Sequence, residues 1–567
     1  MKTLNLHTDY IKFKPLKKAL KSVEDLSDLE KEEKHVENAL AVLTAVEKGD
    51  ENVEGVVGEL INSIKDIAKQ LDVSNIVLYP YAHLSSDLAP PNVAIEVLNL
   101  AEKLLKKENF NVHKAPFGYY KEFEMKVKGH PLSELSRNIK VKGNEVEEKY
   151  NPQQLLREIS KSKLDTSKLK ENDHRILGKQ MDLYSFNEVA PGMVFWHNNG
   201  LIIRNELINF WREEHKKNGY QEISTPQILD KKLWQISGHW EKYKDNIFLT
   251  EYEKREFAVK PMNCPGGMLI FKNSPKSYKE LPLRVGELGV VHRQELSGVL
   301  GGLFRVIQFT QDDAHIYCDE KSVEEELKKV IDLIGVFYKK FNLSYRVEVS
   351  TRPEKRIGDD KMWDLAESIL KKVVKSKKLD YKINEGDGAF YGPKIDFHVK
   401  DSLGREWQCA TLQLDFAMPE RFELEYTDED NKKKRPIMLH RTVYGSLERF
   451  IGILIEHTNG RLPTWLAPMQ VRVLNFTERN ENYAKEVIKK LGDGIPNLRI
   501  DTDFRNNTVP SKVKEAELMK VPYVIVVGDK EEKEKSLAVR IRGSNKIQNF
   551  GVDEFVEKLR NEIEGRV

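Results

Sequence analysis

Hydrophobic and polar positions divide the chain into blocks, and the first block, residues 1–139, predicts an α/β module. The run NIVLYPY at 75–81 is rich in β-branched and aromatic residues, which favours a buried strand. Apolar residues recur at helical spacing through 93–107, so we expect a helix there. The segment 110–129 has a Pro/Gly turn between two strand-like runs and predicts strand, turn, strand.

The middle block, residues 185–466, has a different pattern. A long amphipathic helix is predicted at 201–219, followed by a short proline-containing strand at 220–228. The runs at 283–295 and 302–317 predict two paired strands around a Gly-rich turn.

The last block, residues 467–567, alternates strand and helix patterns. VRVLNF at 471–476 and VPYVIVVGD at 521–529 predict buried strands, with helical patterns at 481–491 and 512–519. This alternation is typical of a module with a mostly parallel sheet.

Residues 140–184 join the first block to the middle one. They are rich in lysine and glutamate and poor in aromatic residues, which predicts a mildly basic, helical and solvated linker. The fold class expected for the whole chain is therefore α/β multidomain.

Composition narrows the class of protein. The 567 residues include 92 Lys and Arg against 90 Asp and Glu, a net charge of +2, so a uniformly basic nucleic-acid binder is excluded. No apolar run approaches the ~18 residues that span a bilayer, and the first residues lack the apolar stretch of a signal peptide. The three cysteines, Cys264, Cys318 and Cys409, give no disulfide framework. We expect a cytoplasmic protein with reduced thiols and no membrane partner.

The chain has no local fingerprint for binding a nucleotide. There is no G-x-x-x-x-G-K-[ST], and GDGAFYG at 386–392 lacks the context of a dinucleotide loop. HRQELSGVLGGLFRV at 292–306 offers another route, because Arg293 and Arg305 flank a Gly-rich turn. The planar guanidinium of arginine matches phosphate and carboxylate groups, so this hairpin could hold a triphosphate.

These residues resemble the class II aminoacyl-tRNA synthetases. HRQE at 292–295 is similar to motif 2, YGSLERFIG at 444–452 to motif 3, and the helix and strand at 201–228 to motif 1, which forms a dimer interface in that family. The class I signatures HIGH and KMSKS are absent. Within class II, five segments resemble the threonyl-tRNA synthetase family: KPMNCPG (260–266), QDDAH (311–315), AFYGPKIDF (389–397), WQCATLQLDF (407–416) and MLHRTVYGS (438–446).

The resemblance implies a fold and a reaction. Residues 185–466 would form a class II catalytic domain, an antiparallel sheet with helices. The protein would be a homodimer that uses ATP with magnesium to activate L-threonine and then transfers threonine to tRNA(Thr).

The resemblance also implies a zinc site. Cys264, His315 and His440 match the three zinc ligands of the family, one ion per subunit, with a fourth position open to threonine. Asp313 would lie beside the threonine hydroxyl, so that valine, which lacks this group, is rejected. We expect Cys318 to be a packing residue. Gly267 stands where the family commonly has histidine.

The remaining pocket residues follow the same resemblance. Arg293 would bind the α-phosphate and the threonine carboxylate, Arg305 the phosphate tail, Glu295 the adenine amino group, and Arg449 the adenine face or phosphates. His239 would take part in proton transfer during tRNA charging. Gln408 and Ser446 are expected on the ATP side, and Gln311, Tyr391, Lys394 and Gln413 on the threonine side.

The first block resembles the archaeal-type editing domain of the same family, which is related in fold to D-aminoacyl-tRNA deacylases. The likeness rests on YPYAHLSSDLA (79–89), KAPFGYYK (114–121) and GHPLSELSR (129–137), and it places His83, Tyr120, Lys121 and Glu134 on functional positions. Serine differs from threonine by one methyl group, worth ~1–3 kcal/mol, so a second site is needed to reject it. We expect residues 1–139 to hydrolyse Ser-tRNA(Thr).

The last block resembles the class IIa anticodon-binding domain, with Arg540 and Arg542 as candidate contacts. The nearest alternatives are a prolyl or seryl ligase, a non-ligating RNA-binding paralogue, and a factor that only deacylates. The candidate zinc ligands argue against the first, the four arginine and glutamate positions of the ATP clamp against the second, and the complete middle block against the third.

Overall fold

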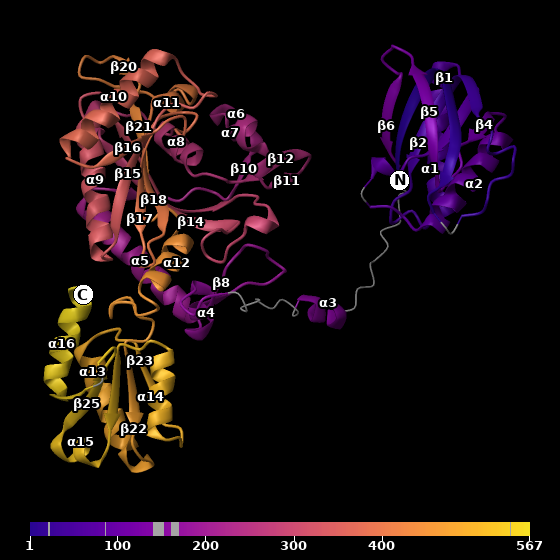
Figure 1. Cartoon of the computed structure of the whole chain (residues 1–567). Coiled ribbons are helices and arrows are strands. Elements are labelled where there is room, and N and C mark those ends of the chain that lie inside the picture. Colours follow the sequence, from indigo (N-terminus) through magenta and orange to yellow (C-terminus); the bar gives the residue numbers. More distant parts are fainter. Residues whose placement is uncertain (21–22, 86, 140–151, 160–168, 545) are drawn as a thin grey trace. The chain divides into compact units, whose positions relative to one another are not determined.

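The computed structural model describes residues 1–20, 23–85, 87–139, 152–159, 169–544 and 546–567 (Figure 1). The chain separates into two compact units, Met1–Pro152 and Gln153–Val567. It is a multidomain α/β protein, as predicted. Among the described residues, no helix is long and apolar enough to cross a membrane.

Unit 1 is a six-stranded mixed sheet with strand order β4-β3-β2-β1-β5 and with β6 paired to β1. Its elements are β1 (Lys2–Lys18), β2 (Lys34–Ala45), α1 (Val53–Leu71), β3 (Asn75–Pro80), the 3-10 turn η1 (Ala82–Leu84), α2 (Pro91–Lys107), β4 (Asn111–Lys114), β5 (Tyr119–Val127) and β6 (Glu134–Asn138). The predicted strand, helix and strand-turn-strand are confirmed. Alternation along β3 buries Ile76 and Leu78 against the helices, and turns Val77 and Tyr79 to the other face.

Unit 2 is built around an eight-stranded sheet with the order β16-β15-β17-β18-β21-β14-β13-β9. Its neighbours pair antiparallel except β15 with β16 and β13 with β9. The elements up to the first long strand are α3 (Pro152–Ile159), α4 (His174–Gln180), β7 (Tyr184–Ser185), β8 (Phe195–Trp196), α5 (Asn198–Lys217), β9 (Gln221–Glu222), β10 (Ile228–Asp230), α6 (Lys231–Ser237), α7 (His239–Tyr243), β11 (Leu249–Tyr252), β12 (Arg255–Val259), α8 (Cys264–Lys272) and β13 (Leu283–His292). They continue with β14 (Gln308–Cys318), α9 (Val323–Lys340), β15 (Ser344–Ser350), α10 (Asp360–Ser376), β16 (Tyr381–Asn384), β17 (Lys394–Lys400), β18 (Glu406–Asp415), α11 (Ala417–Arg421), β19 (Tyr426–Thr427), β20 (Lys433–Lys434), β21 (Ile437–Thr442) and α12 (Leu447–His457).

The predicted helix at 201–219 and the paired strands around a Gly-rich turn are confirmed as α5, β13 and β14. The predicted strand at 220–228 is wrong in its extent. It is reduced to β9 and the separate β10, with Pro226 between them. Proline has no N–H to donate to a strand ladder, so it interrupts the pairing.

The predicted solvated linker ends earlier than expected. Residues 140–151 and 160–168 lie outside the described residues, but 174–184 pack into the large core. His174 and Leu183 are fully buried there, and Leu177 and Met181 are 2% exposed. The burial was not predicted because the segment is rich in charged residues. Its few apolar residues lie on one side of the short helix α4, and that side packs against the core.

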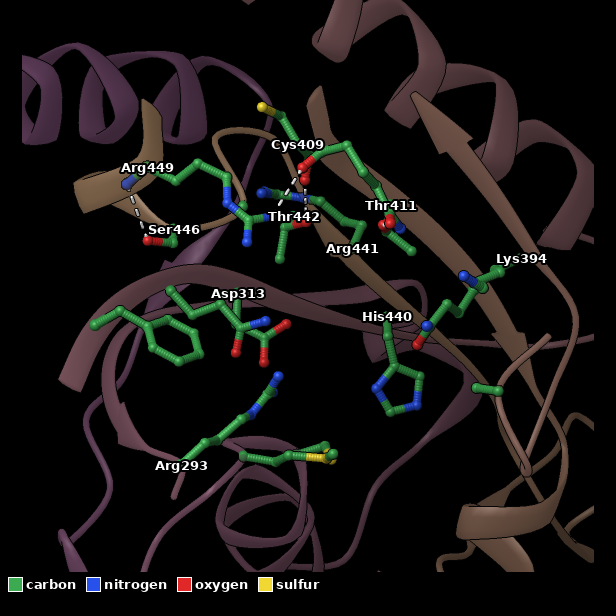
Figure 2. Close-up of a pocket in the computed structure, with 18 of the residues that line it drawn as sticks. Arg293, Asp313, Lys394, Cys409, Thr411, His440, Arg441, Thr442, Ser446 and Arg449 are labelled. Carbon is green, nitrogen blue, oxygen red and sulfur yellow. Dashed lines mark hydrogen bonds between the residues drawn. The ribbon is translucent and has the colours of Figure 1, made fainter. Parts of the chain in front are cut away.

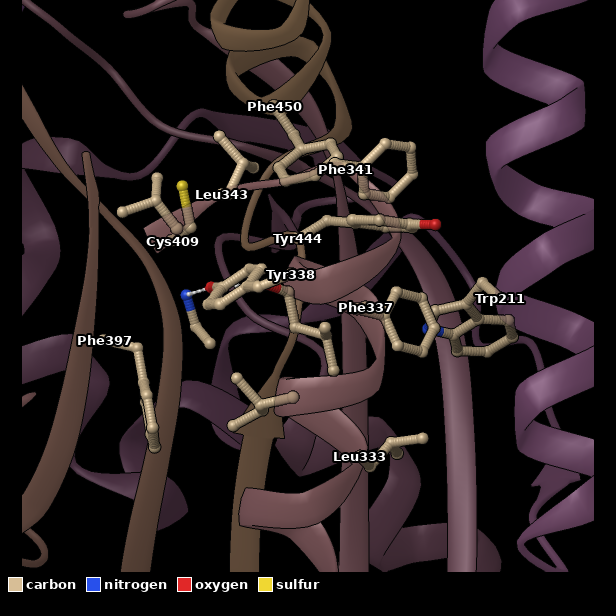
Figure 3. Packing of buried hydrophobic residues seen from close by; sticks show 14 of the residues in the cluster. Trp211, Leu333, Phe337, Tyr338, Phe341, Leu343, Phe397, Cys409, Tyr444 and Phe450 are labelled. Atoms are coloured by element: carbon tan, nitrogen blue, oxygen red, sulfur yellow. Dashed lines mark hydrogen bonds between the residues drawn. The ribbon is translucent and has the colours of Figure 1, made fainter. Parts of the chain in front are cut away.

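One face of the large sheet packs against helices and forms the main core (Figure 3). Helices α5, α9, α10 and α12 contribute to it. At its centre the Tyr338 hydroxyl accepts a hydrogen bond from Ala410 N (2.8 Å) and donates one to Val443 O (3.0 Å). A buried hydroxyl thereby joins β18 to the turn before α12. The opposite face of the sheet carries the polar side chains that line a cavity.

The C-terminal part of unit 2 is a five-stranded sheet with the order β23-β22-β24-β25-β26, parallel across the first three strands. Its elements are β22 (Val471–Asn475), α13 (Glu481–Gly494), β23 (Ile500–Asp503), α14 (Val509–Leu518), β24 (Tyr523–Val527), α15 (Asp529–Glu534), β25 (Ser536–Ile541), β26 (Ile547–Gly551) and α16 (Val552–Glu564). The predicted strands, helices and parallel pairing are confirmed. Arg499 bonds to Glu206 of α5 (2.9 Å), and Arg566 bonds to Glu213 of the same helix (2.7 Å).

Candidate functional site

Four predicted site residues lie in one row across neighbouring strands. Lys394 of β17 pairs with Gln413 of β18, and Gln413 pairs with His440 of β21. His440 in turn pairs with His315 of β14. Because side chains alternate along a strand, the residues one step away face the helical core, and this row faces the open side of the sheet.

Cys264 joins the two histidines of this row from the first residue of α8. The candidate ligand atoms of Cys264, His315 and His440 lie within 4.8 Å of one another, and all three side chains are buried. His315 Nε2 is buried without a hydrogen-bond partner among the described residues, which costs about 1–3 kcal/mol unless another group binds it. One thiolate and two imidazoles are a donor set that catalytic zinc takes, with a fourth position left open, so these residues fit the ion.

Asp415 orients one of these ligands. Its Oδ2 accepts a hydrogen bond from His440 Nε2 at 2.7 Å, and its Oδ1 accepts from the backbone N–H groups of Ala417 and Met418. A carboxylate only accepts, so Nε2 carries the proton and Nδ1 of His440 is the nitrogen left to bind a cation. Asp415 was not predicted, although it lies two residues after Gln413 and therefore on the same face of β18.

A cavity of about 610 Å³ opens on this face of the sheet (Figure 2). Thirteen of the predicted residues line it: Cys264, Arg293, Glu295, Arg305, Gln311, Asp313, Tyr391, Lys394, Gln408, Gln413, His440, Ser446 and Arg449. His315 and His239 are not among the lining residues. Segments far apart in the sequence thus converge on one hollow large enough for a nucleotide and an amino acid.

Three predicted arginines lie along the cavity. Arg293 donates to Pro261 O (3.2 Å), and its guanidinium lies 5.2 Å from the centre of the Phe309 ring. Arg305 and Glu295 form an ion pair with N–O distances of 2.8 and 3.1 Å. This pair was not anticipated, since the two residues were expected to bind different parts of ATP.

Arg449 lies on the first turn of α12, where its backbone N–H donates to the capping Ser446 Oγ (3.2 Å). Its guanidinium Nε donates to Phe304 O at 2.9 Å. The helix and the loop before β14 therefore fix this arginine together.

The threonine side of the cavity is tied by polar contacts. Tyr391 donates its hydroxyl proton to Gln413 Oε1 (2.7 Å), and Lys394 binds Asp396 (2.8 Å) and Asp387 (3.0 Å). Asp313 Oδ2 accepts from Asn263 Nδ2 at 3.3 Å. Burial raises the pKa of the Asp313 carboxyl.

Gln408, expected on the ATP side, donates to Asp396 Oδ1 at 2.7 Å. Its side chain therefore shares a carboxylate with Lys394, which links the two sides of the cavity.

His239 is fully buried beside the cavity and packs against Phe390 and Tyr391. Its Nδ1 bonds to Ser237 Oγ (2.8 Å), and its Nε2 has no partner within the described ranges. Burial lowers its pKa to about 3, so the ring is neutral at physiological pH. A neutral imidazole can accept a proton only from a group that reaches Nε2.

Gly267 and Cys318 are the other two residues that the sequence singles out near the metal group, by which we mean Cys264, His315 and His440. A Cβ on Gly267 would meet only ordinary contacts, the nearest at 3.6 Å from His315 Nδ1. Cys318 is fully buried, with its Sγ 3.6 Å from Ile437 O. It stands on the core face of β14, opposite to His315.

Unit 1 contains a second cavity of about 600 Å³. His83, Tyr120 and Lys121 line it, together with the unpredicted Tyr79. Lys121 Nζ donates to Pro116 O (2.9 Å) and Tyr119 O (3.0 Å), and burial lowers its pKa to about 8. Glu134 is exposed on β6 and is not among the lining residues.

In the C-terminal sheet, Arg542 is used for internal contacts. It donates to Lys520 O (2.7 Å) and, through its other terminal nitrogen, to Leu462 O. Arg540 lies on β25, and its buried Nε has no partner in the part of the chain that the structure describes. The geometry of Arg542 leaves fewer of its donors for an RNA base.

Three family models match consecutive parts of the chain. Residues 1–139 match the archaea-specific editing domain of threonyl-tRNA synthetase, and residues 248–458 match the class II core domain of the G, H, P, S and T synthetases. Residues 470–562 match the anticodon-binding domain.

Curated relatives and solved structures agree with these models. The chain is 53% identical over 397 residues to a threonine–tRNA ligase of Desulforamulus reducens, covering 70% of this chain and 62% of the relative. It is 54% identical over 394 residues to that of Caldanaerobacter subterraneus, covering 70% and 61%. The chain thus matches only about three fifths of the length of these relatives.

Two solved structures are similar over nearly their whole length. The RNA-binding domain of threonyl-tRNA synthetase from Cryptosporidium parvum is 38% identical with a TM-score of 0.67, covering 69% of this chain and 98% of that one. An Aeropyrum pernix protein described as a threonyl-tRNA synthetase is 30% identical with a TM-score of 0.60, covering 69% and 97%.

Proposed function

Because the chain belongs to the threonyl-tRNA synthetase family, we propose that it is a threonine–tRNA ligase. It activates L-threonine with ATP and magnesium to threonyl-adenylate and pyrophosphate, and it transfers threonine to tRNA(Thr). The observation that carries this proposal is the buried Cys264, His315 and His440 group beside the cavity that also holds Arg293 and Arg449.

The metal group would bind one zinc ion per subunit, and the ion when bound supplies a Lewis acid that threonine's amino and hydroxyl groups can coordinate. Asp313 lines the same cavity and accepts the hydroxyl proton in a hydrogen bond. Valine fills the same volume without a hydroxyl, so it would leave the buried Asp313 unpaired, which is why it is rejected.

Arg293 and Arg449 supply the positive charge for adenylate formation. The phosphorus centre gains negative charge as the threonine carboxylate attacks, and two fixed guanidiniums stabilise that charge without reorganising. Glu295 releases Arg305 when the phosphate tail arrives and can then accept from the adenine amino group. Gln311, Tyr391, Lys394 and Gln413 hold the amino acid, and Gln408 and Ser446 hold the nucleotide side.

His239 takes part in transfer to tRNA. Its Nε2, which no described residue binds, lies beside Tyr391 and would hydrogen-bond the ribose hydroxyl; because burial lowers the pKa of the ring, it would relay the proton rather than hold it.

Residues 1–139 form an editing domain that hydrolyses Ser-tRNA(Thr). The zinc site would recognise threonine by its hydroxyl, which serine also has. The missing methyl group changes the binding free energy by only ~1–3 kcal/mol, which is too little to exclude serine. The second cavity supplies His83, Tyr120 and Lys121 for this task, and Glu134 takes part from the exposed strand β6.

The other parts follow from the family. The linker lies within residues 140–184, of which the part from His174 on packs into the core of the catalytic domain. Residues 185–466 are the catalytic domain and 467–567 the anticodon-binding domain. The protein is a homodimer through the α5 region. Its three buried, unpaired cysteines suit the reducing cytoplasm, where tRNA is charged.

Threonine-dependent exchange of labelled pyrophosphate into ATP tests the ligase reaction, with proline and serine as competing amino acids and with a zinc chelator. We expect exchange that needs threonine and is lost with the chelator. Exchange with proline alone, or no exchange with threonine, would overturn the assignment.

A further inference from the structure

His174, at the first residue of α4, lies between two elements that carry the ATP-side arginines. It is fully buried. Its Nδ1 donates to Glu456 Oε1 (2.6 Å), and its Nε2 accepts from the backbone N–H of Leu303 (3.0 Å). The carboxylate fixes the tautomer, and both ring nitrogens are engaged, so His174 with Asp173 and Glu456 is not a free metal site.

The loop that His174 binds comes unusually close to the imidazole. Gly302 has φ +56°, and a Cβ there would lie 2.2 Å from His174 Nε2. Only glycine permits both this backbone conformation and this approach. The next ring in the loop, Phe304, packs against the imidazole with centroids 4.3 Å apart.

The same loop holds the arginines of the cavity. Phe304 O accepts from Arg449 Nε (2.9 Å), and Arg305 is the next residue. On its other side, His174 binds Glu456, which lies near the end of α12, the helix whose first turn carries Arg449. A single imidazole therefore ties the loop with Arg305 to the helix with Arg449.

We propose that His174 is a positioning residue for ATP. It holds residues 302–304 against α12, so that Arg305 and Arg449 converge on the nucleotide. This role rests on the proposed ligase function. It also gives the last part of the 140–184 segment a defined task in the catalytic domain.

The test uses the whole 567-residue chain in threonine-dependent pyrophosphate exchange. We expect His174→Ala to raise the KM for ATP about tenfold or more, while the KM for threonine and the bound metal stay near the parent values. His174→Gln should recover much of the loss, since its amide oxygen can accept from Leu303 N. Lys179→Ala is the matched control on the same helix. It should leave the KM for ATP unchanged, because the Lys179 side chain is exposed, whereas Arg175 packs against Gly302 of the same loop.

A double-mutant cycle with Gly302→Ala gives a second readout if His174→Ala is poorly folded. The added methyl clashes with the imidazole of the parent, but His174→Ala removes that imidazole, so the two effects on the KM for ATP should be less than additive. Additive effects, or an equal rise in Lys179→Ala, would overturn the positioning role. A parent without threonine-dependent exchange would instead overturn the proposed function.

Discussion

His315 and His440 face each other across the paired strands β14 and β21, with their rings edge to face and the centroids 5.0 Å apart. Two strands that are remote in sequence thereby present two imidazoles to the thiol of Cys264. The pairing register, rather than local spacing, makes this group.

Removing a ligand should remove both metal and activity. We expect His440→Ala to lose most bound zinc and threonine-dependent exchange, because two remaining ligands hold the ion poorly. Metal analysis of the purified protein and the exchange assay measure this. Cys318→Ala is the control, since this thiol lies on the core face of β14 and should keep the metal. Full zinc in His440→Ala would show that the ligand set is wrong.

Asp415→Asn tests the orientation of His440. The amide can place a donor where His440 Nε2 also donates, so the ring must change tautomer or turn away from the metal. We expect metal affinity to fall about 10–100-fold, measured by competition with a chelator. The backbone contacts of Oδ1 survive in asparagine, so the melting temperature should change little. Unchanged zinc affinity would refute the role of Asp415.

Lys121 gives a prediction about pH. Its pKa is lowered to about 8 by burial, so the neutral amine, the form that can take a proton from water, becomes more abundant as pH rises. Enzymatic hydrolysis of Ser-tRNA(Thr), after subtraction of the uncatalysed rate, should rise about tenfold per pH unit below that pKa and level off above it. Lys121→Arg stays charged and should abolish this rise. A flat profile from about pH 6 to 9 would contradict the base role.

Two adjacent glycines of α8 should respond in opposite ways. Gly267→Ala adds a methyl with contacts no closer than 3.6 Å, so removal of a helical glycine should stabilise the protein by up to about 1 kcal/mol. Gly266→Ala puts its Cβ 2.9 Å from Thr225 and should destabilise it. Thermal unfolding of both variants measures the difference. A lower melting temperature for Gly267→Ala would mean that the space beside His315 is needed empty.

Short-range patterns predicted the regular elements well. The strand at 75–81 and the helix at 201–219 carry their periodicity within one segment, so β3 and α5 follow directly. The 220–228 strand failed because Pro226 overrides the strand pattern. The packing of 174–184 was missed because burial of a few apolar residues depends on a core formed by distant segments.

The candidate site was predictable where family motifs carry it, as at Arg293, Cys264 and Lys394. Asp415 and His174 were not, because each acts through a hydrogen bond to a residue far away in sequence. The Arg305–Glu295 ion pair was also not predicted, because it depends on the conformation of the loop between the two residues. Such contacts depend on the register of paired strands and on the conformation of loops, which a local sequence pattern does not determine.

Helix α5 connects the catalytic core to the C-terminal sheet region. Glu206 and Glu213 are seven residues apart on α5, about two helical turns, and each binds an arginine from the C-terminal sheet region. The same helix buries Trp211 and Leu207 in the catalytic core. Because one helix contacts both parts, it fixes the distance between the cavity and the C-terminal sheet. Under the proposed function, that is the distance between the site for the acceptor end of the tRNA and the site for its anticodon.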